Sequence, residues 1–243
     1  MNQIKMQLQK YMYNTGLCPV NPGVYGAVHT CIEYIMDEFN LFNRICITAK
    51  TRSGKSYLAR YLIEKHKNDF DKIILICPTE KINGFYKGLV KEEDIYETVN
   101  EDWIKQLFER IANTEKEKRK NVLIIADDVG NEAFVRTAAF KNLYSKGRHY
   151  MISTIFLCQY LYMLPAQCRS NIDYLVCGQM NVASRKILED EFNFSNLKPQ
   201  EFIKLYNNST NDYNFLIINC NSVKDIDDLN ELYGIIKTPK NYL

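Results

Sequence analysis

Residues 45–62 read ICITAKTRSGKSYLARYL, and this stretch decides the fold. An apolar, strand-like run enters a short polar loop that ends in Gly54, Lys55 and Ser56, and a helical pattern follows. Such a loop surrounds a chain of phosphates with its backbone N–H groups, and Gly54 lets the backbone approach the anion closely. Lys55 can reach the outer phosphates, and the Ser56 hydroxyl can ligate Mg²⁺. The pattern therefore predicts a site for ATP and Mg²⁺. The expected binding loop comprises Ala49, Lys50, Thr51, Arg52, Ser53, Gly54, Lys55, Ser56 and Tyr57.

Two later strand-like runs end in residues that suit phosphate chemistry. The run NVLIIADD ends in Asp127 and Asp128, and the run STIFLCQ ends in Gln159. Because Mg²⁺ prefers oxygen ligands, we assign Asp127 to the metal together with Ser56. We expect Asp128 to activate the attacking water. The Gln159 amide can bind both a phosphate oxygen and that water.

Short apolar runs alternate with helical patterns over most of the chain, which predicts an α/β fold. We expect a three-layer P-loop NTPase with a mainly parallel central sheet flanked by helices. The expected strands are Arg44–Thr48, Lys72–Cys77, Asn121–Ala126, Ser153–Cys158, Asp173–Gly178 and Asn214–Asn219. The expected helices are Val24–Phe39, Lys55–Lys67, Glu101–Lys120, Glu132–Ser145 and Ala183–Phe192. The expected organisation is a helical lead-in (1–42), an ATPase core (43–220) and a C-terminal tail (221–243).

Composition excludes several classes of protein. The chain has 243 residues, with 31 Lys and Arg against 29 Asp and Glu, so its formal net charge is +2. This balance excludes a generally basic nucleic-acid coat but allows a locally basic surface. The 8 cysteines form no C-x-x-C pair and the 3 histidines are scattered, so we expect reduced thiols and no zinc site. No apolar run reaches about 18 residues, so we expect no membrane span.

The segment from Lys146 to Leu188 carries a resemblance to a known family. It reads KGRHYMISTIFLCQYLYMLPAQCRSNIDYLVCGQMNVASRKIL. With SGKS and IIADD, it resembles the FtsK/HerA superfamily of DNA-pumping ATPases, and most closely the poxvirus-type genome packaging ATPases of large DNA viruses and virophages. The matching features are GRH before a strand, Gln159 at its end, LP, RSN, IDY and SRKIL.

The resemblance implies an ASCE-type (RecA-like) core with an extra strand between the phosphate-loop strand and the acidic strand. It also implies a homo-oligomeric ring, a hexamer or pentamer, in which an arginine from the neighbouring subunit completes each catalytic site. Arg148 is the first candidate because it matches the arginine before the family's sensor strand. Arg169 is the second candidate and Arg185 the third. From the residues alone, each could instead be a solvated or ion-paired surface arginine.

The function expected from this resemblance is ATP-driven packaging of a viral double-stranded DNA genome into a capsid. A pump must grip DNA of any sequence, so it contacts phosphates through a few basic residues. Lys141, Lys146 and His149 are candidates, whereas the charged run Glu115–Lys120 is more typical of a solvated helix end. Capsid proteins are further expected partners, and the expected location is the host cytoplasm, at the viral factory, or the virion.

Three alternatives remain open at this stage. A P-loop kinase would transfer phosphate to a small acceptor, although no lid-like segment is evident. A virion switch protein would bind ATP with little turnover, which the replacement of the first loop glycine by Ala49 supports. A conjugation-type or chromosome-segregation pump would share the fold, but its bacterial forms usually carry further domains.

Overall fold

The computed structural model describes residues 43–129, 133–195, 197–221 and 232–238. Within these residues the chain forms an eight-stranded sheet with the spatial order β3-β2-β4-β5-β1-β6-β7-β8. The first six strands in this order run parallel, whereas β7 pairs antiparallel with β6 and with β8. The strands are β1 (Arg44–Thr48), β2 (Lys72–Ile76), β3 (Ile95–Tyr96), β4 (Val122–Ala126), β5 (Ile152–Cys158), β6 (Tyr174–Cys177), β7 (Asn214–Asn219) and β8 (Tyr233–Lys237).

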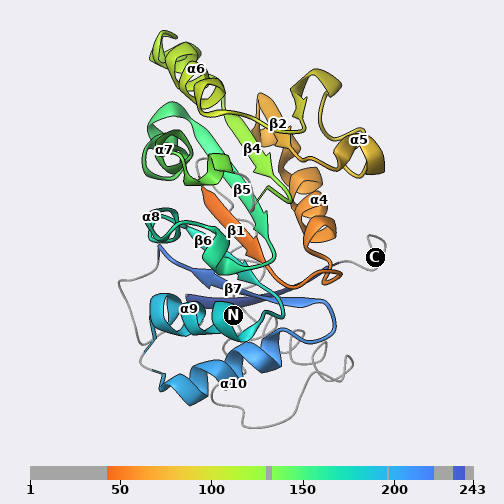
Figure 1. Cartoon of the computed structure of the whole chain (residues 1–243), viewed down its shortest axis with the longest axis vertical. Helices are drawn as coiled ribbons and strands as arrows, with labels where there is room; N and C mark the ends of the chain where they lie inside the picture. The colour runs from red at the N-terminus through yellow and green to blue at the C-terminus, as the bar shows by residue number, and fades with distance from the viewer. Residues whose placement is uncertain (1–42, 130–132, 196, 222–231, 239–243) are drawn as a thin grey trace, which may run out of the picture.

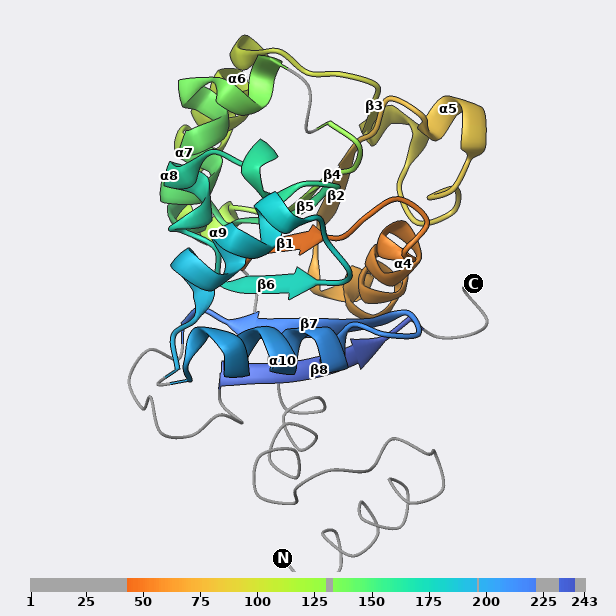
Figure 2. The same cartoon turned by 60° about the horizontal axis from the view of Figure 1, so that its bottom comes forward.

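Helices cover both faces of this sheet, as Figures 1 and 2 show. One face packs against α4 (Lys55–His66) and the segment around Tyr86. The other packs against α6 (Glu101–Ala112), α7 (Ala138–Lys146), α9 (Val182–Phe192) and α10 (Pro199–Ser209). Strands β1, β4 and β5 are buried along their whole length. Their side chains alternate between the two faces of the sheet, so each strand contributes apolar residues to both cores. The predicted three-layer α/β class is confirmed.

All six expected strands are present, with ends that differ by at most one residue from the expected ones. The spatial order also contains the extra strand that the resemblance implied, because β5 lies between β1 and β4. Parallel strands align their carboxyl ends, so the residues that follow β4, β5 and β1 meet at one edge. We call this edge the carboxyl edge and the opposite one the amino edge.

Two expected helices were too long. The helix expected over Glu101–Lys120 ends at Ala112, because the polar run after it offers no apolar side chain to pack on the sheet. Arg119 donates hydrogen bonds to carbonyls of Ala112 and Thr114 at this end. The helix expected over Glu132–Ser145 begins only at Ala138, after the 3₁₀ turn η4 (Ala133–Arg136). Thr137 caps it by accepting a hydrogen bond from the Phe140 amide.

Several elements were not predicted. These are α10, the two-residue strand β3, and the short helices α5 (Glu80–Asn83) and α8 (Ala166–Arg169). Strand β8 lies within the segment expected as a tail, so the sheet extends beyond residue 220. The expected helix Val24–Phe39 lies outside the described residues.

Candidate functional site

The phosphate loop follows β1 at the carboxyl edge and leads directly into α4. Gly54 is the N-cap of α4 with φ 89°, and Arg52 also has a positive φ of 60°. These left-handed residues turn the chain sharply into α4, whose first amides have no partner within the helix. Lys55 is buried, and its ammonium donates a hydrogen bond to the Lys50 carbonyl across the loop at 3.1 Å. Burial lowers the pKa of Lys55, while the carboxylates of Asp127 and Asp128 oppose that shift.

The structure accounts for the alanine at the first loop position. Ala49 is fully buried, and a Cβ placed on Gly178 would lie 2.9 Å from the Ala49 Cβ. The same Cβ would also meet the Phe215 ring at 2.9 Å. Because position 178 carries no side chain, the Ala49 methyl fits without displacing the loop. A hydrogen bond from the Lys50 amide to the Gln179 carbonyl, at 2.7 Å, fixes the loop to the end of β6.

Asp127 lies at the end of β4, facing the start of α4, and is only 4% exposed. The Ser56 hydroxyl lies close enough to this carboxylate to lower its pKa, so the structure brings the two predicted metal ligands together. Burial raises the pKa of Asp127 to about 6 and the charge on Asp128 adds to the rise, although hydrogen bonds and Lys55 oppose it. A carboxylate held this way favours a cation beside it.

Tyr86 is a site residue that sequence reasoning missed. It is 1% exposed, and its hydroxyl donates a hydrogen bond to Asp127 Oδ2 at 2.8 Å. Its backbone amide donates to the buried Glu80 carboxylate at 2.8 Å. Tyr86 also packs edge-on against Phe85, which contacts Tyr57 of α4 in the same way. The segment after β2 thus connects the phosphate-loop helix to the acidic strand. The sequence of this segment, which is interrupted by Gly and Pro residues, did not indicate this contact.

Asp128 and Gln159 complete the carboxyl edge. Asp128 is exposed and adopts φ 59°, a conformation that aspartate tolerates better than most residues and that recurs at functional sites. Gln159 directly follows β5, the strand between β4 and β1, and is partly exposed. The strand order thus places Gln159 between the phosphate loop, which follows β1, and the pair Asp127 and Asp128, which follows β4.

The residues present fit a magnesium site of the kind used with phosphates. No cluster of three His, Cys, Asp or Glu side chains occurs among the residues that the structure describes. Ser56 and Asp127 provide two oxygen ligands in contact with each other. Mg²⁺ is usually held by one or two carboxylates and completes its shell with waters and substrate phosphates, so two protein ligands suffice.

The candidate arginines do not lie together. Arg148 belongs to the 3₁₀ turn η5 (Gly147–Tyr150) before β5, and Arg169 ends α8 before β6, so both lie at the amino edge. Arg169 makes a bidentate pair with Glu191, at 2.6 and 2.8 Å, and also donates to the Leu164 carbonyl. The Arg148 side chain is 53% exposed and lies 3.6 Å from Asp173. Neither reaches the phosphate loop of its own chain, whereas Arg185 lies at the carboxyl edge near Lys50.

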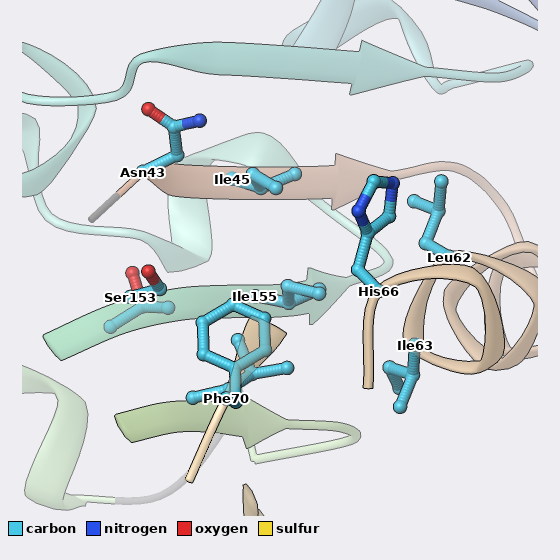
Figure 3. A pocket seen from close by; sticks show the side chains of 10 residues that line it. Asn43, Ile45, Leu62, Ile63, His66, Phe70, Ser153 and Ile155 are labelled. Carbon is cyan, nitrogen blue, oxygen red and sulfur yellow. The ribbon is translucent and has the colours of Figure 1, made fainter. Parts of the chain in front are cut away.

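A small apolar cavity of about 30 Å³ lies at the amino edge, away from this site. Figure 3 shows Ile45, Ile155 and Phe70 around it, with His66 from the end of α4. Its position at the start of β1 and β5 separates it from the phosphate loop, so it plays no part in nucleotide binding. In the described part of the chain, no helix is long and apolar enough to cross a membrane.

Comparisons with known proteins agree with this geometry. The model of the poxvirus A32 protein family matches residues 35–228. A Frog virus 3 protein is 27% identical over 168 residues, which are 67% of this chain and 51% of that protein. The chain therefore spans about half the length of this relative. An Invertebrate iridescent virus 6 protein is 26% identical over 197 residues, covering 78% of this chain and 75% of that protein.

Among solved structures, the genome packaging NTPase B204 of Sulfolobus turreted icosahedral virus 2, bound to AMPPCP, has a TM-score of 0.59 at 17% identity. The match covers 82% of this chain and 99% of B204. The pCW3 conjugation coupling protein TcpA, with ATPγS, has a TM-score of 0.53 at 15% identity, over 75% of this chain and 59% of TcpA. These likenesses show the fold. The family match covers most of the chain, and the chain belongs to the poxvirus A32 protein family.

Proposed function

We propose that this chain is an ATP-hydrolysing DNA translocase that packages a viral double-stranded DNA genome into a capsid. The observation that carries the proposal is the contact between Ser56 of the phosphate loop and Asp127 of the acidic strand, in a member of the A32 family. B204, which has the same fold, is a genome packaging NTPase and binds AMPPCP, which supports nucleotide binding here.

The residues at the carboxyl edge divide the work of phosphoryl transfer. Backbone amides at Gly54 and the Lys55 ammonium hold the phosphates. Ser56 and Asp127 would hold Mg²⁺, which would neutralise charge on the outer phosphates. Asp128, exposed beside this pair, orients the attacking water and accepts its proton. Gln159 donates a hydrogen bond to the terminal phosphate and positions the water. The Tyr86 hydroxyl keeps Asp127 oriented toward Ser56.

A neighbouring subunit supplies the remaining positive charge in this proposal. Arg148 is the better candidate, because it is more than half exposed, whereas the bidentate pair with Glu191 occupies the Arg169 guanidinium. An arginine at the amino edge of one chain can serve a site at the carboxyl edge of the next through a head-to-tail interface, and repeated contacts of this kind close into a ring when the rotation between subunits allows it. Such a ring, a hexamer or pentamer, would form around the DNA.

Basic residues near η5 suit a sequence-independent DNA grip. Lys146 and His149 are exposed and Lys141 is partly exposed, on α7 and the following turn. The charged run Glu115–Lys120 forms a loop with a short 3₁₀ turn, and Lys118 pairs with Glu115 within it. In a ring, each such cation is repeated around the pore, so a few per subunit hold the duplex. Capsid proteins would be further partners, in the virus factory or the virion.

The test is steady-state ATP hydrolysis by the assembled protein, with and without duplex DNA. We expect duplex DNA of any sequence to stimulate hydrolysis, and Lys55→Ala and Asp128→Asn each to lower the rate by about 100-fold or more. Lys65→Ala, on the same helix but in its last turn, is the matched control and should retain the rate. Absence of DNA stimulation in the assembled protein, or phosphate transfer to a small acceptor instead of water, would contradict the proposal.

A further inference from the structure

Tyr86 distinguishes the two oxygens of the Asp127 carboxylate. Its buried hydroxyl donates a hydrogen bond to Oδ2 at 2.8 Å, and in the described part of the chain no hydrogen bond reaches Oδ1. The Ser56 hydroxyl lies close to both side chains. A cation beside Ser56 would therefore meet an aspartate with one oxygen occupied by Tyr86 and one oxygen open.

The number of open carboxylate oxygens bears on which divalent cation fits. Ca²⁺ takes about six to eight oxygen ligands at roughly 2.3–2.6 Å and accepts both oxygens of one carboxylate, whereas Mg²⁺ requires near-octahedral geometry at about 2.0–2.1 Å. The narrow bite of a single carboxylate suits the larger, less regular shell. A hydrogen bond that occupies Oδ2 opposes binding of Asp127 through both oxygens, so it favours the smaller ion.

Tyr86 is held in place through its backbone by Glu80. The Tyr86 amide donates to Glu80 Oε1 at 2.8 Å, and the Gly84 amide donates to the Glu80 carbonyl at 2.7 Å. Gly84 has φ 56°, so the chain turns sharply between the two residues. Glu80 is 4% exposed, and within the described residues its Oε2 has no hydrogen-bond partner. Burying this carboxylate is costly, and the bond that it does make fixes Tyr86.

A second set of contacts attaches the same segment to α4. Arg60, one turn after Ser56, donates a hydrogen bond from Nη1 to the Phe85 carbonyl, and its guanidinium lies 5.8 Å from the centre of the Phe85 ring. That ring packs edge-on against Tyr57 at 4.9 Å. Figures 1 and 2 show α5 on the same side of the sheet as α4. Tyr86 is thus fixed relative to the helix that carries Ser56.

We propose that Tyr86 is a specificity-determining residue of the metal site, which selects Mg²⁺ over Ca²⁺ by restricting Asp127 to a single metal-binding oxygen. Glu80 is a positioning residue that acts through Tyr86. This inference rests on the proposed site for ATP and Mg²⁺, and adds to it the residues that decide which divalent cation enters. Removal of a partner that orients a metal ligand typically costs about 10- to 100-fold in metal affinity.

The experiment measures how strongly each cation supports nucleotide binding. Dissociation constants of AMPPCP are determined by calorimetry with saturating Mg²⁺, with saturating Ca²⁺ and with a chelator. The full chain is compared with Tyr86→Phe, which keeps the ring and removes the hydroxyl. We expect Tyr86→Phe to weaken binding by about 10- to 100-fold with Mg²⁺, and to change it by less than about twofold with Ca²⁺ or without metal.

Two variants of Glu80 test the positioning role. Glu80→Gln keeps an oxygen that can accept from the Tyr86 amide, so it should bind AMPPCP as the unaltered chain does. Glu80→Ala removes that oxygen and should weaken binding with Mg²⁺ by about 3- to 10-fold, with a smaller change in Ca²⁺. If Glu80→Gln loses as much as Glu80→Ala, the positioning role of the Glu80 hydrogen bond is wrong.

A matched control and the remaining outcomes separate this inference from the function on which it rests. Tyr150→Phe makes the same change at the amino edge, where Tyr150 packs against Phe108, and should bind AMPPCP normally with both cations. If neither cation strengthens AMPPCP binding by the unaltered chain, the proposed metal site fails. If Mg²⁺ does so but Tyr86→Phe weakens binding equally with both cations, or with neither, Tyr86 does not select the metal and the phosphate site stands.

Discussion

A buried aspartate lies at each edge of the sheet, Asp127 at the carboxyl edge and Asp173 at the amino edge, and their surroundings differ. Asp127 at the carboxyl edge and Asp173 at the amino edge are 4% and 3% exposed. Asp173 accepts two hydrogen bonds from the Arg44 guanidinium, both at 2.7 Å, and one from the Arg44 amide at 2.8 Å. Asp127 accepts a hydrogen bond from the uncharged hydroxyl of Tyr86, and the Ser56 hydroxyl and the Lys55 ammonium lie nearby.

This difference separates a structural carboxylate from a functional one. A buried ion pair with its hydrogen bonds satisfied holds β1 to β6 and leaves nothing for a ligand. A buried carboxylate that only hydroxyls contact keeps an unfavourable charge, which a metal ion relieves. The unfavourable burial of the Asp127 charge thus indicates the functional site as clearly as the phosphate-loop motif does.

The largest effect concerns the relation between the two edges. Arg148→Ala leaves the nucleotide site of its own chain intact but removes the cation at the amino edge. Lys55→Ala disables the nucleotide site but keeps that cation. Arg148→Ala alone should lose about 1,000-fold in hydrolysis, because an arginine supplied in trans contributes that much to phosphoryl transfer. Lys55→Ala alone should lose about 100-fold or more. Mixing the two variants should restore part of the rate, measured against total protein concentration.

The control for this mixture is Lys146→Ala, which has an exposed side chain near Arg148 and no predicted catalytic role. It should hydrolyse ATP at the normal rate in the absence of DNA. No recovery on mixing, in a preparation that does assemble, would mean that Arg148 does not complete a neighbour's site.

The second prediction compares the two aspartates directly. Asp173→Asn should lower the free energy of unfolding by about 3–5 kcal/mol, because it leaves Arg44 buried without its counter-charge. Asp127→Asn should leave it unchanged or raise it, since a buried charge is removed. Urea unfolding at pH 7, without Mg²⁺ or nucleotide, measures both. Equal destabilisation by the two substitutions would contradict the distinction between the edges.

A third prediction follows from the pKa of Asp127, which rises from 3.8 to about 6 in the folded chain. The folded state binds this proton more tightly than the unfolded state does. The contribution to stability is therefore present below about pH 4 and is lost as pH rises to about 6, by about 3 kcal/mol. Asp127→Asn removes this dependence. The difference in unfolding free energy between variant and unaltered chain should grow over that range, and a constant difference would refute the assignment.

The smallest effect tests the fit of the phosphate loop against β6. Gly178→Ala should destabilise the chain by about 1–3 kcal/mol, because its methyl would meet Ala49 and Phe215 at 2.9 Å. Combining it with Ala49→Gly should recover part of the loss, since one of the two contacts is relieved. Thermal unfolding of the four variants in this cycle gives the coupling. Strict additivity would show that Ala49 and Gly178 do not share that space.

Sequence patterns predicted the elements whose signal is local. The six strands were found because each is a short apolar run, and Lys55, Ser56, Asp127, Asp128 and Gln159 were placed by their position after such runs. Helix α10 was not predicted, although Pro199 occupies its first helical position, where proline is common. Strand β8 was assigned to the tail, although Tyr233, Ile235 and Ile236 are apolar, and it joins the sheet by pairing with β7.

The unpredicted parts of the site depend on contacts between distant segments. Tyr86 approaches Asp127 from 41 residues away, and the pair has no local sequence signature. The opposite placement of Arg148 and the phosphate loop is a property of sheet topology, since one precedes a strand and the other follows one. Arg185 was predicted as a third trans arginine; the fold places it at the carboxyl edge, in the same cleft as Lys50, and its catalytic role stays a prediction.

We propose that ATP hydrolysis at the carboxyl edge depends on assembly of the chain around duplex DNA. The most direct test is the ATPase rate per subunit as a function of protein concentration, with and without duplex DNA. We predict a rate that rises cooperatively with concentration and rises further with DNA of any sequence. A rate per subunit that is independent of both would contradict the account.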